Sequence, residues 1–118
     1  MKPESIQERT FRFGVNIIHL VKDFPKTSVG FALSSQIIRS ATSIGANIAK
    51  AQDAVSRADF THSINISLKE ARETEFWLKT IIGSKILPEG KYTLLLEEIE
   101  EIVKILRASL KKLKNINK

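Results

Sequence analysis

Residues 92–113, YTLLLEEIEEIVKILRASLKKL, decide the fold class. Apolar side chains recur there every three or four residues, the spacing that places them on one side of an α-helix. This apolar stripe consists of Tyr92, Leu95, Leu96, Ile99, Ile102, Val103, Leu106, Leu110 and Leu113. Charged residues fill most of the remaining positions, so the stretch predicts an amphipathic helix that buries one face.

Three further segments have the same periodicity. The first has a possible capping box at Ser5 and Glu8 and is stopped by Pro25, and the third has a similar cap at Ser56. We expect the four helices at about 5–24, 31–51, 57–82 and 91–115. Helices of about 20 residues with short connections favour antiparallel neighbours. The sequence therefore predicts one all-α domain, 1–118, folded as an up-down-up-down four-helix bundle.

The composition is that of an ordinary globular domain. Hydrophobic residues make up 42% of the 118 and charged residues 27%, so neither disorder nor a membrane protein is indicated. No apolar run reaches the roughly 20 residues of a bilayer crossing, and the N-terminus lacks the apolar core of a secretory signal. We therefore expect a cytoplasmic protein. The sequence has no cysteine, which excludes disulfides and thiolate metal sites.

The second segment is almost without charge. Between Thr27 and Ala49 the only ionisable side chain is Arg39, whereas a surface helix normally has a charged face. A helical wheel gives the segment a second face of small and apolar side chains, and the first segment has apolar residues off its own stripe. We expect a subunit interface formed by Phe11, Val15, Ile18, Ile38, Thr42, Gly45, Ala46 and Ala49. The alternative is an exposed face rich in alanine and serine.

Two blocks of sequence carry a family resemblance. Residues 39–49, RSATSIGANIA, resemble the signature of the four-helix-bundle proteins associated with 23S rRNA intervening sequences. Residues 56–60, SRADF, and 66–78, ISLKEARETEFWL, resemble further stretches of that family. This family commonly has a glutamate after the Asn-x-Ala stretch, where this chain has Lys50. Any role that an acidic side chain has at that position in the family is therefore not expected for this chain.

The resemblance has implications for assembly and function. It implies a bundle that assembles as a homopentameric barrel, with no established enzymatic activity across most of the family. Some relatives resemble the accessory variability determinants of diversity-generating retroelements, which are basic barrels that bind nucleic acid and a reverse transcriptase.

Basic residues suggest a polyanionic partner. The net charge of +6 attracts polyanions over long distances. We expect nucleic acid to contact Arg9, Arg12, Lys22, Lys50, Arg107, Lys111, Lys112 and Lys114. The last four of these form a C-terminal basic cluster together with Lys118. The alternative is that the C-terminal cations only stabilise the dipole of their helix. In a symmetric ring, however, the cluster repeats in every subunit and forms a basic rim.

Four polar or aromatic residues are expected to have structural roles. Glu70 lies among apolar neighbours on a helical wheel, so its carboxylate needs a partner, either Arg39 or Arg107. We expect Asn47 to hydrogen-bond across helices or to cap a neighbouring loop. Trp77 is expected to anchor the core or an interface rather than to stack on a base.

Catalytic and metal-binding patterns are weak. His62 follows Asp59 in an Asp-x-x-His arrangement, but bundle-type metal sites need two such elements, and His19 lacks the matching acid. We therefore expect no metal, no cofactor and no enzymatic activity. The predicted function is a homo-oligomeric scaffold that associates with RNA or DNA. The alternative is a protein-interaction module that binds a partner such as a reverse transcriptase.

Overall fold

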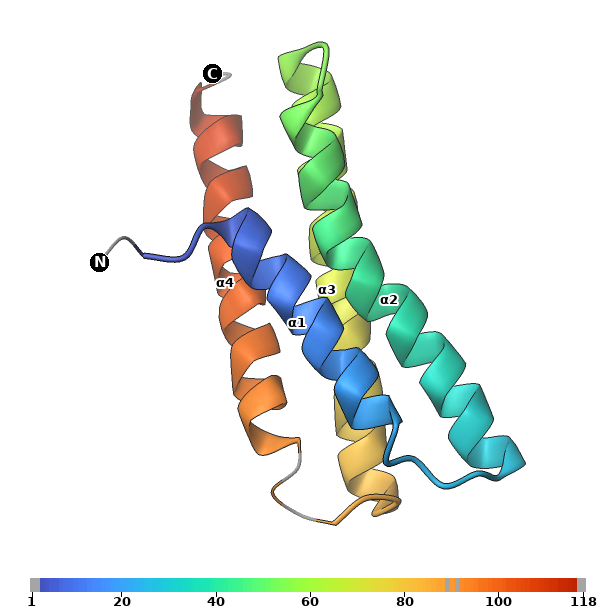
Figure 1. Ribbon diagram of the computed structural model, residues 1–118. Coiled ribbons are helices and arrows are strands. Elements are labelled where there is room, and N and C mark those ends of the chain that lie inside the picture. Colours follow the sequence, from blue (N-terminus) through green and yellow to red (C-terminus); the bar gives the residue numbers. More distant parts are fainter. Residues whose placement is uncertain (1–2, 89, 91, 117–118) are drawn as a thin grey trace.

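The computed structural model describes residues 3–88, 90 and 92–116, and that part of the chain is all-α without strands. Its helices are α1 (Ile6–Val21), α2 (Ser28–Gln52), α3 (Arg57–Ser84) and α4 (Thr93–Ile116). The long helices α2 and α3 pack together, α4 lies beside α3, and the shorter α1 packs against α2 and α4 (Figure 1). The α2–α3 connection and the end of α4 lie at one end of the molecule, and the other two connections lie at the opposite end (Figure 1). None of these four helices is long and apolar enough to cross a membrane.

The first helix begins as its cap predicts and ends early. Ser5 is the N-cap, and its hydroxyl accepts a hydrogen bond from the backbone N–H of Glu8 at 3.1 Å. The helix ends at Val21 rather than at Phe24, because in a continuing helix Pro25 could not donate to the Val21 carbonyl oxygen and its ring would clash with that carbonyl. Phe24 nevertheless remains buried, so the turn after α1 still contributes to the core.

The second helix begins earlier than expected, at Ser28 rather than at Phe31. Thr27 is its N-cap and accepts a hydrogen bond from the backbone N–H of Gly30 at 3.1 Å. Gly30 is therefore in the first turn of the helix, not in the loop. A Cβ atom at Gly30 would lie 1.9 Å from the carbonyl oxygen of Pro25, so only glycine fits where the chain folds back on itself.

The third helix continues past Gly83, where we expected it to stop. Nothing lies within 4 Å of a Cβ atom placed on Gly83, and a single helical glycine costs only about 1 kcal/mol. The helix ends at Ser84, and Lys85 takes the left-handed conformation with φ 57°. The fourth helix begins at Thr93, and Lys91, its expected first residue, lies outside the described residues.

The core joins all four helices, and part of it is polar. The apolar side chains that recur along α1, α2 and α4 are largely buried, whereas Phe60, Leu68 and Ile82 of α3 are only half-buried. Instead, α3 turns small hydroxyl side chains toward α2. Ser67 Oγ donates to the carbonyl oxygen of Ile44 at 2.9 Å, and other buried hydroxyls belong to Thr10, Ser40, Ser63 and Thr74. These compact side chains allow α2 and α3 to pack closely.

Candidate functional site

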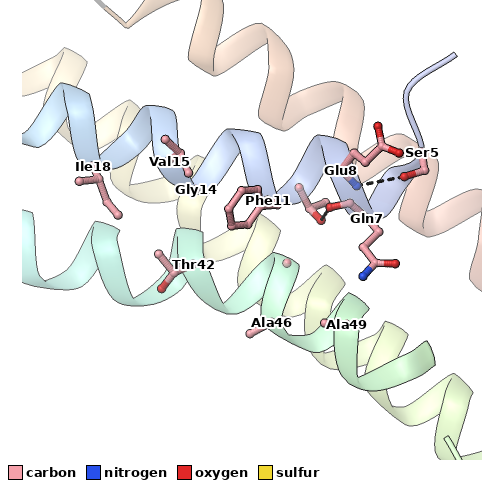
Figure 2. A pocket seen from close by; sticks show the side chains of 12 residues that line it. Ser5, Gln7, Glu8, Phe11, Gly14, Val15, Ile18, Thr42, Ala46 and Ala49 are labelled. Atoms are coloured by element: carbon pink, nitrogen blue, oxygen red, sulfur yellow. Dashed lines mark hydrogen bonds between the residues drawn. The ribbon is translucent and has the colours of Figure 1, made fainter. Parts of the chain in front are cut away.

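An apolar groove runs between α1 and α2 (Figure 2). Its volume is about 690 Å³. Nearly all of the predicted interface residues line it: Phe11, Val15, Ile18, Thr42, Gly45, Ala46 and Ala49. Ile38 is half-buried and is not among the lining residues. The Phe11 side chain is 70% exposed, an unusual position for a phenylalanine and one typical of a contact surface.

The groove floor is a close contact between two helix backbones of the same chain. A Cβ atom on Gly45 would lie 3.3 Å from the backbone nitrogen of Phe11 and 3.3 Å from the carbonyl carbon of Thr10. A Cβ atom on Gly14 would lie 3.6 Å from the carbonyl oxygen of Ala41. The backbone that approaches Gly45 most closely is therefore that of α1 in the same chain. The place of Gly45 in a subunit interface stays a prediction.

The groove lining carries one ionisable side chain among the described residues. Glu8 lies at the end of the groove near the start of α1, beside Ser5 and Gln7 (Figure 2). No lysine or arginine is among the lining residues. A partner that fills the groove therefore meets an apolar surface with an acidic end.

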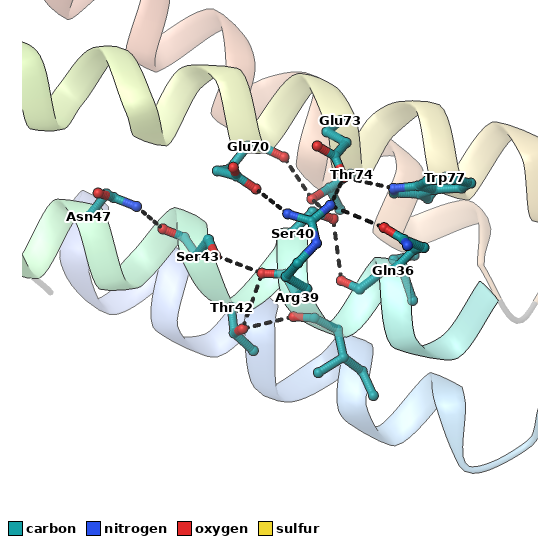
Figure 3. A network of polar contacts seen from close by, with 12 residues as sticks. Gln36, Arg39, Ser40, Thr42, Ser43, Asn47, Glu70, Glu73, Thr74 and Trp77 are labelled. Atoms are coloured by element: carbon teal, nitrogen blue, oxygen red, sulfur yellow. Dashed lines mark hydrogen bonds and ion pairs between the residues drawn. The ribbon is translucent and has the colours of Figure 1, made fainter. Parts of the chain in front are cut away.

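A polar cluster bridges α2 and α3 around Arg39 (Figure 3). Arg39 Nη1 lies 3.3 Å from Glu70 Oε2, and its Nη2 contacts Glu73. Arg39, rather than Arg107, is thus the partner of Glu70, whose side chain is only 15% exposed. Glu73 also accepts a hydrogen bond from Trp77 Nε1 at 3.0 Å. That bond, together with Arg39, holds the pKa of Glu73 below the ordinary glutamate value.

The other two residues expected to be structural differ in their contacts. Asn47 Nδ2 donates to the carbonyl oxygen of Ser43 at 2.8 Å, within its own helix. This corrects the expected bond to another helix or loop, because the i−4 carbonyl is nearer to the side chain. Trp77 packs half-buried against the core, and the rings of Trp77 and Phe76 meet edge to face with centroids 5.2 Å apart.

Two of the predicted nucleic-acid contacts lie in a charged contact between α1 and α4. Arg9 donates from Nε and Nη2 to the Glu98 carboxylate, both at 2.7 Å, and also contacts Glu101 at 3.2 Å. Arg12 pairs with Glu4 at 2.7 Å and with Glu98 at 3.5 Å. The Arg9 bonds lower the pKa of Glu98 and raise that of Arg9. Both arginine charges are therefore balanced within the chain.

Most of the other predicted cations gather at one end of the molecule. Lys50 lies in the last turn of α2, and α4 carries Arg107, Lys111, Lys112 and Lys114 along its second half. These two helices end at the same end of the molecule (Figure 1). We call this set, with Arg57, the basic end. The structure describes no ion pair to any of its side chains, and Lys118 lies outside the described residues.

Two residues change the predicted basic surface. Lys22 follows the last residue of α1, at the end of the molecule opposite the basic end, so it does not extend that surface. Arg57, the first residue of α3, was not predicted but lies at the basic end. Its position could have been inferred, because a helix that follows α2 after a short connection begins where α2 ends.

The fold and its surfaces define a small all-α protein of four helices with a charge-poor groove and a basic end. The family model of the 23S rRNA-intervening sequence protein matches residues 4–108. The chain therefore belongs to the 23S rRNA-intervening sequence protein family.

A solved structure agrees with this assignment. A protein from Bacteroides thetaiotaomicron, described as a protein of unknown function from the S23 ribosomal protein family, has a 1.70 Å crystal structure. It is 40% identical to this chain, the match covers 91% of this chain and 99% of that one, and the TM-score is 0.84. A search of curated proteins found no match.

Proposed function

We propose that this protein is a non-catalytic scaffold, an antiparallel four-helix bundle that assembles into a homo-oligomeric, pentameric ring and binds RNA or DNA. The observation that carries the proposal is the basic end, where cations from α2, α3 and α4 lie together without carboxylate partners in the described part of the chain. Long-range attraction to phosphates and counterion release follow from such a cluster. Membership of a family named for 23S rRNA intervening sequences supports a nucleic-acid partner.

The groove supports the assembly. An apolar surface that leaves Phe11 70% exposed favours burial against another chain. In a cyclic ring every subunit would contribute its own basic end, so the ring would contact several phosphates at once. Light scattering on purified protein should therefore give a multiple of the 13.3 kDa chain mass. A monomer at micromolar concentration would contradict the assembly.

Salt-dependent binding tests the nucleic-acid partner. Wild-type protein is titrated with structured RNA and with duplex DNA at several salt concentrations, and the affinity should fall steeply as salt rises. A variant with Lys111→Gln, Lys112→Gln and Lys114→Gln should bind with a weaker salt dependence. The slope of log affinity against log salt should be smaller in magnitude by about 1 for each phosphate that the variant no longer neutralises. Salt-independent binding, or no binding, would reject the proposal.

A matched control removes the same charge elsewhere. Lys22→Gln, Lys26→Gln and Lys85→Gln lie near the end of α1, in the next connection and after α3, all at the opposite end of the molecule. This variant has the same net charge as the first but an intact basic end. It should retain most of the binding and of the salt dependence. Equal losses in both variants would mean that net charge alone attracts the nucleic acid.

The second candidate is a protein-interaction module without direct nucleic-acid binding. The balanced charges of Arg9 and Arg12 favour it, because these two of the eight predicted cations are paired with carboxylates of the same chain. Capture of a protein partner that persists after nuclease treatment, by a ring that binds neither RNA nor DNA, would support this candidate.

A further inference from the structure

Ring symmetry limits what can fill the α1–α2 groove, and this inference rests on the proposed ring. In a cyclic ring of more than two subunits, each interface is heterologous, so one surface of a subunit meets a different surface of the next. The groove of one subunit therefore does not face the groove of the next subunit. Its occupant must be another surface of the same chain, on a different side of the molecule.

The outer face of α3 has the properties of that occupant. Its Phe76 side chain is 59% exposed, and Lys69 and Arg72 are exposed on the same side of the helix. In Figure 1, α1 lies in front of the molecule and α3 behind it. A subunit could therefore present the groove to one neighbour and α3 to the other. Leu94 of α4 is also exposed, but the exposed carboxylate of Glu97 lies about one turn after it and would repel Glu8 at the acidic end of the groove.

The Phe76 ring packs against Trp77, which belongs to the polar cluster around Arg39. It meets the ring of Trp77 edge to face at an interplanar angle of 72°. The Trp77 indole donates to Glu73, which in turn contacts Arg39 of α2 (Figure 3). An exposed aromatic side chain supported in this way loses little conformational freedom on binding. The polar cluster around Arg39 therefore positions Trp77, against which the Phe76 ring packs.

Charge and spacing complement each other between the two surfaces. The groove lining contains Glu8 and no basic residue. On α3, Lys69 and Arg72 line a shallow hollow that precedes Phe76. Glu75, next to Phe76 in sequence, is paired with Lys79. Glu8 precedes Phe11 by about one helical turn, and Arg72 precedes Phe76 by about one turn. When Phe76 lies in the groove beside Phe11, Arg72 can reach Glu8.

We propose that the outer face of α3 in one subunit, with Phe76 at its centre, occupies the α1–α2 groove of the next subunit, where Arg72 pairs with Glu8. The occupant is a second copy of this chain. Each subunit contributes one groove and one α3 face, and the repeated contact closes the ring.

Two complementary variants test the pairing. Ala46→Glu places a charge in the groove and leaves α3 intact, whereas Phe76→Glu removes the aromatic contact and leaves the groove intact. Both residues are exposed, so each variant should keep its helical circular dichroism. Each variant alone should be monomeric. A mixture of the two should form a heterodimer of twice the 13.3 kDa chain mass, because one working contact remains.

The possible outcomes separate this proposal from the proposed ring. If wild-type protein is monomeric, both are wrong. If Ala46→Glu dissociates the assembly and Phe76→Glu does not, the groove is an interface but α3 is not its occupant. If both variants are monomeric and their mixture does not associate, the pairing is also overturned.

Charge reversal gives a second test. Glu8→Arg or Arg72→Glu alone should weaken association by about tenfold, and the two changes together should restore it. Failure of the double variant to recover would remove the Glu8–Arg72 pair from the proposal. Leu94→Glu is the matched control, because Leu94 is 76% exposed but lies outside both surfaces, and it should leave assembly unchanged.

Discussion

Helix α1 meets its two neighbours in different ways. Against α2 it packs backbone to backbone, with Gly45 and Gly14 at the contact and no ion pair described. Against α4 it is joined by Arg9 and Arg12, which share the carboxylate of Glu98. The first contact fixes the distance between helices by steric fit, and the second depends on charge. Substitutions should therefore affect the α1–α2 contact most, whereas pH should affect the α1–α4 contact.

The largest effect is expected from Gly45→Val. A Cβ atom already lies at 3.3 Å from the α1 backbone, and the branched Cγ atoms of valine add bulk that the backbone cannot avoid. We expect a loss of about 3 kcal/mol in the free energy of unfolding, measured by urea titration at one protein concentration.

Gly83→Val is the control for this substitution. Gly83 lies in α3 with nothing within 4 Å of the added Cβ, so valine should leave stability unchanged or raise it by a few tenths of a kcal/mol through helix propensity. Equal stability of the two variants would show that the α1–α2 contact is not steric.

Loss of the arginine clamp should have a smaller effect. Arg9→Met keeps much of the apolar side chain but leaves Glu98, only 19% exposed, without its closest partner. We expect a loss of about 1 kcal/mol in the free energy of unfolding, by the same urea titration. Lys79→Met removes an exposed pair with Glu75 and should cost less than about 0.5 kcal/mol. A larger loss from Lys79→Met would reverse the ranking of these pairs.

Low pH should weaken the α1–α4 contact between Arg9 and Glu98. The pKa of Glu98 is lower in the folded protein than in the unfolded chain, because Arg9 hydrogen-bonds its ionised form. Its stabilisation is therefore complete above the unfolded pKa, roughly 4.3, and is lost as pH falls through the lower folded pKa. The free energy of unfolding should fall between pH 6 and pH 3 more steeply for wild type than for Arg9→Met. Parallel pH profiles would mean that Glu98 does not contribute.

The sequence predicted the helices better than it predicted their ends. Apolar periodicity identified four segments, and capping residues such as Ser5 marked real helix starts. The start of α2 was missed by three residues, because the Thr27 cap and the close approach of Gly30 to Pro25 depend on how the chain turns between α1 and α2. Hydroxyl side chains such as Ser67 were left out of the core for a similar reason, since periodicity of apolar residues does not detect them.

The candidate surfaces were predicted unevenly. The charge-poor second helix pointed to a surface that the structure forms as a groove, because a missing charged face is visible in the sequence itself. The basic residues were predicted as one surface, but Arg9 pairs with Glu98, which lies far from it in sequence, and Lys22 lies at the other end. Pairing between distant residues needs the three-dimensional register of α1 against α4, and composition does not supply it.

The smallest expected effect tests Asn47, a residue of α2 that takes part in neither α1 contact. Asn47 donates to the carbonyl oxygen of Ser43 within α2, and that carbonyl is already an acceptor of the helix. Asn47→Ala removes this bond and raises helix propensity, so the two effects offset and stability should change by less than about 0.5 kcal/mol in urea titration. Assembly should also be unchanged by light scattering. Dissociation of the oligomer by Asn47→Ala would instead show that the amide bonds a neighbouring subunit, as a single polar residue in a helical interface can do.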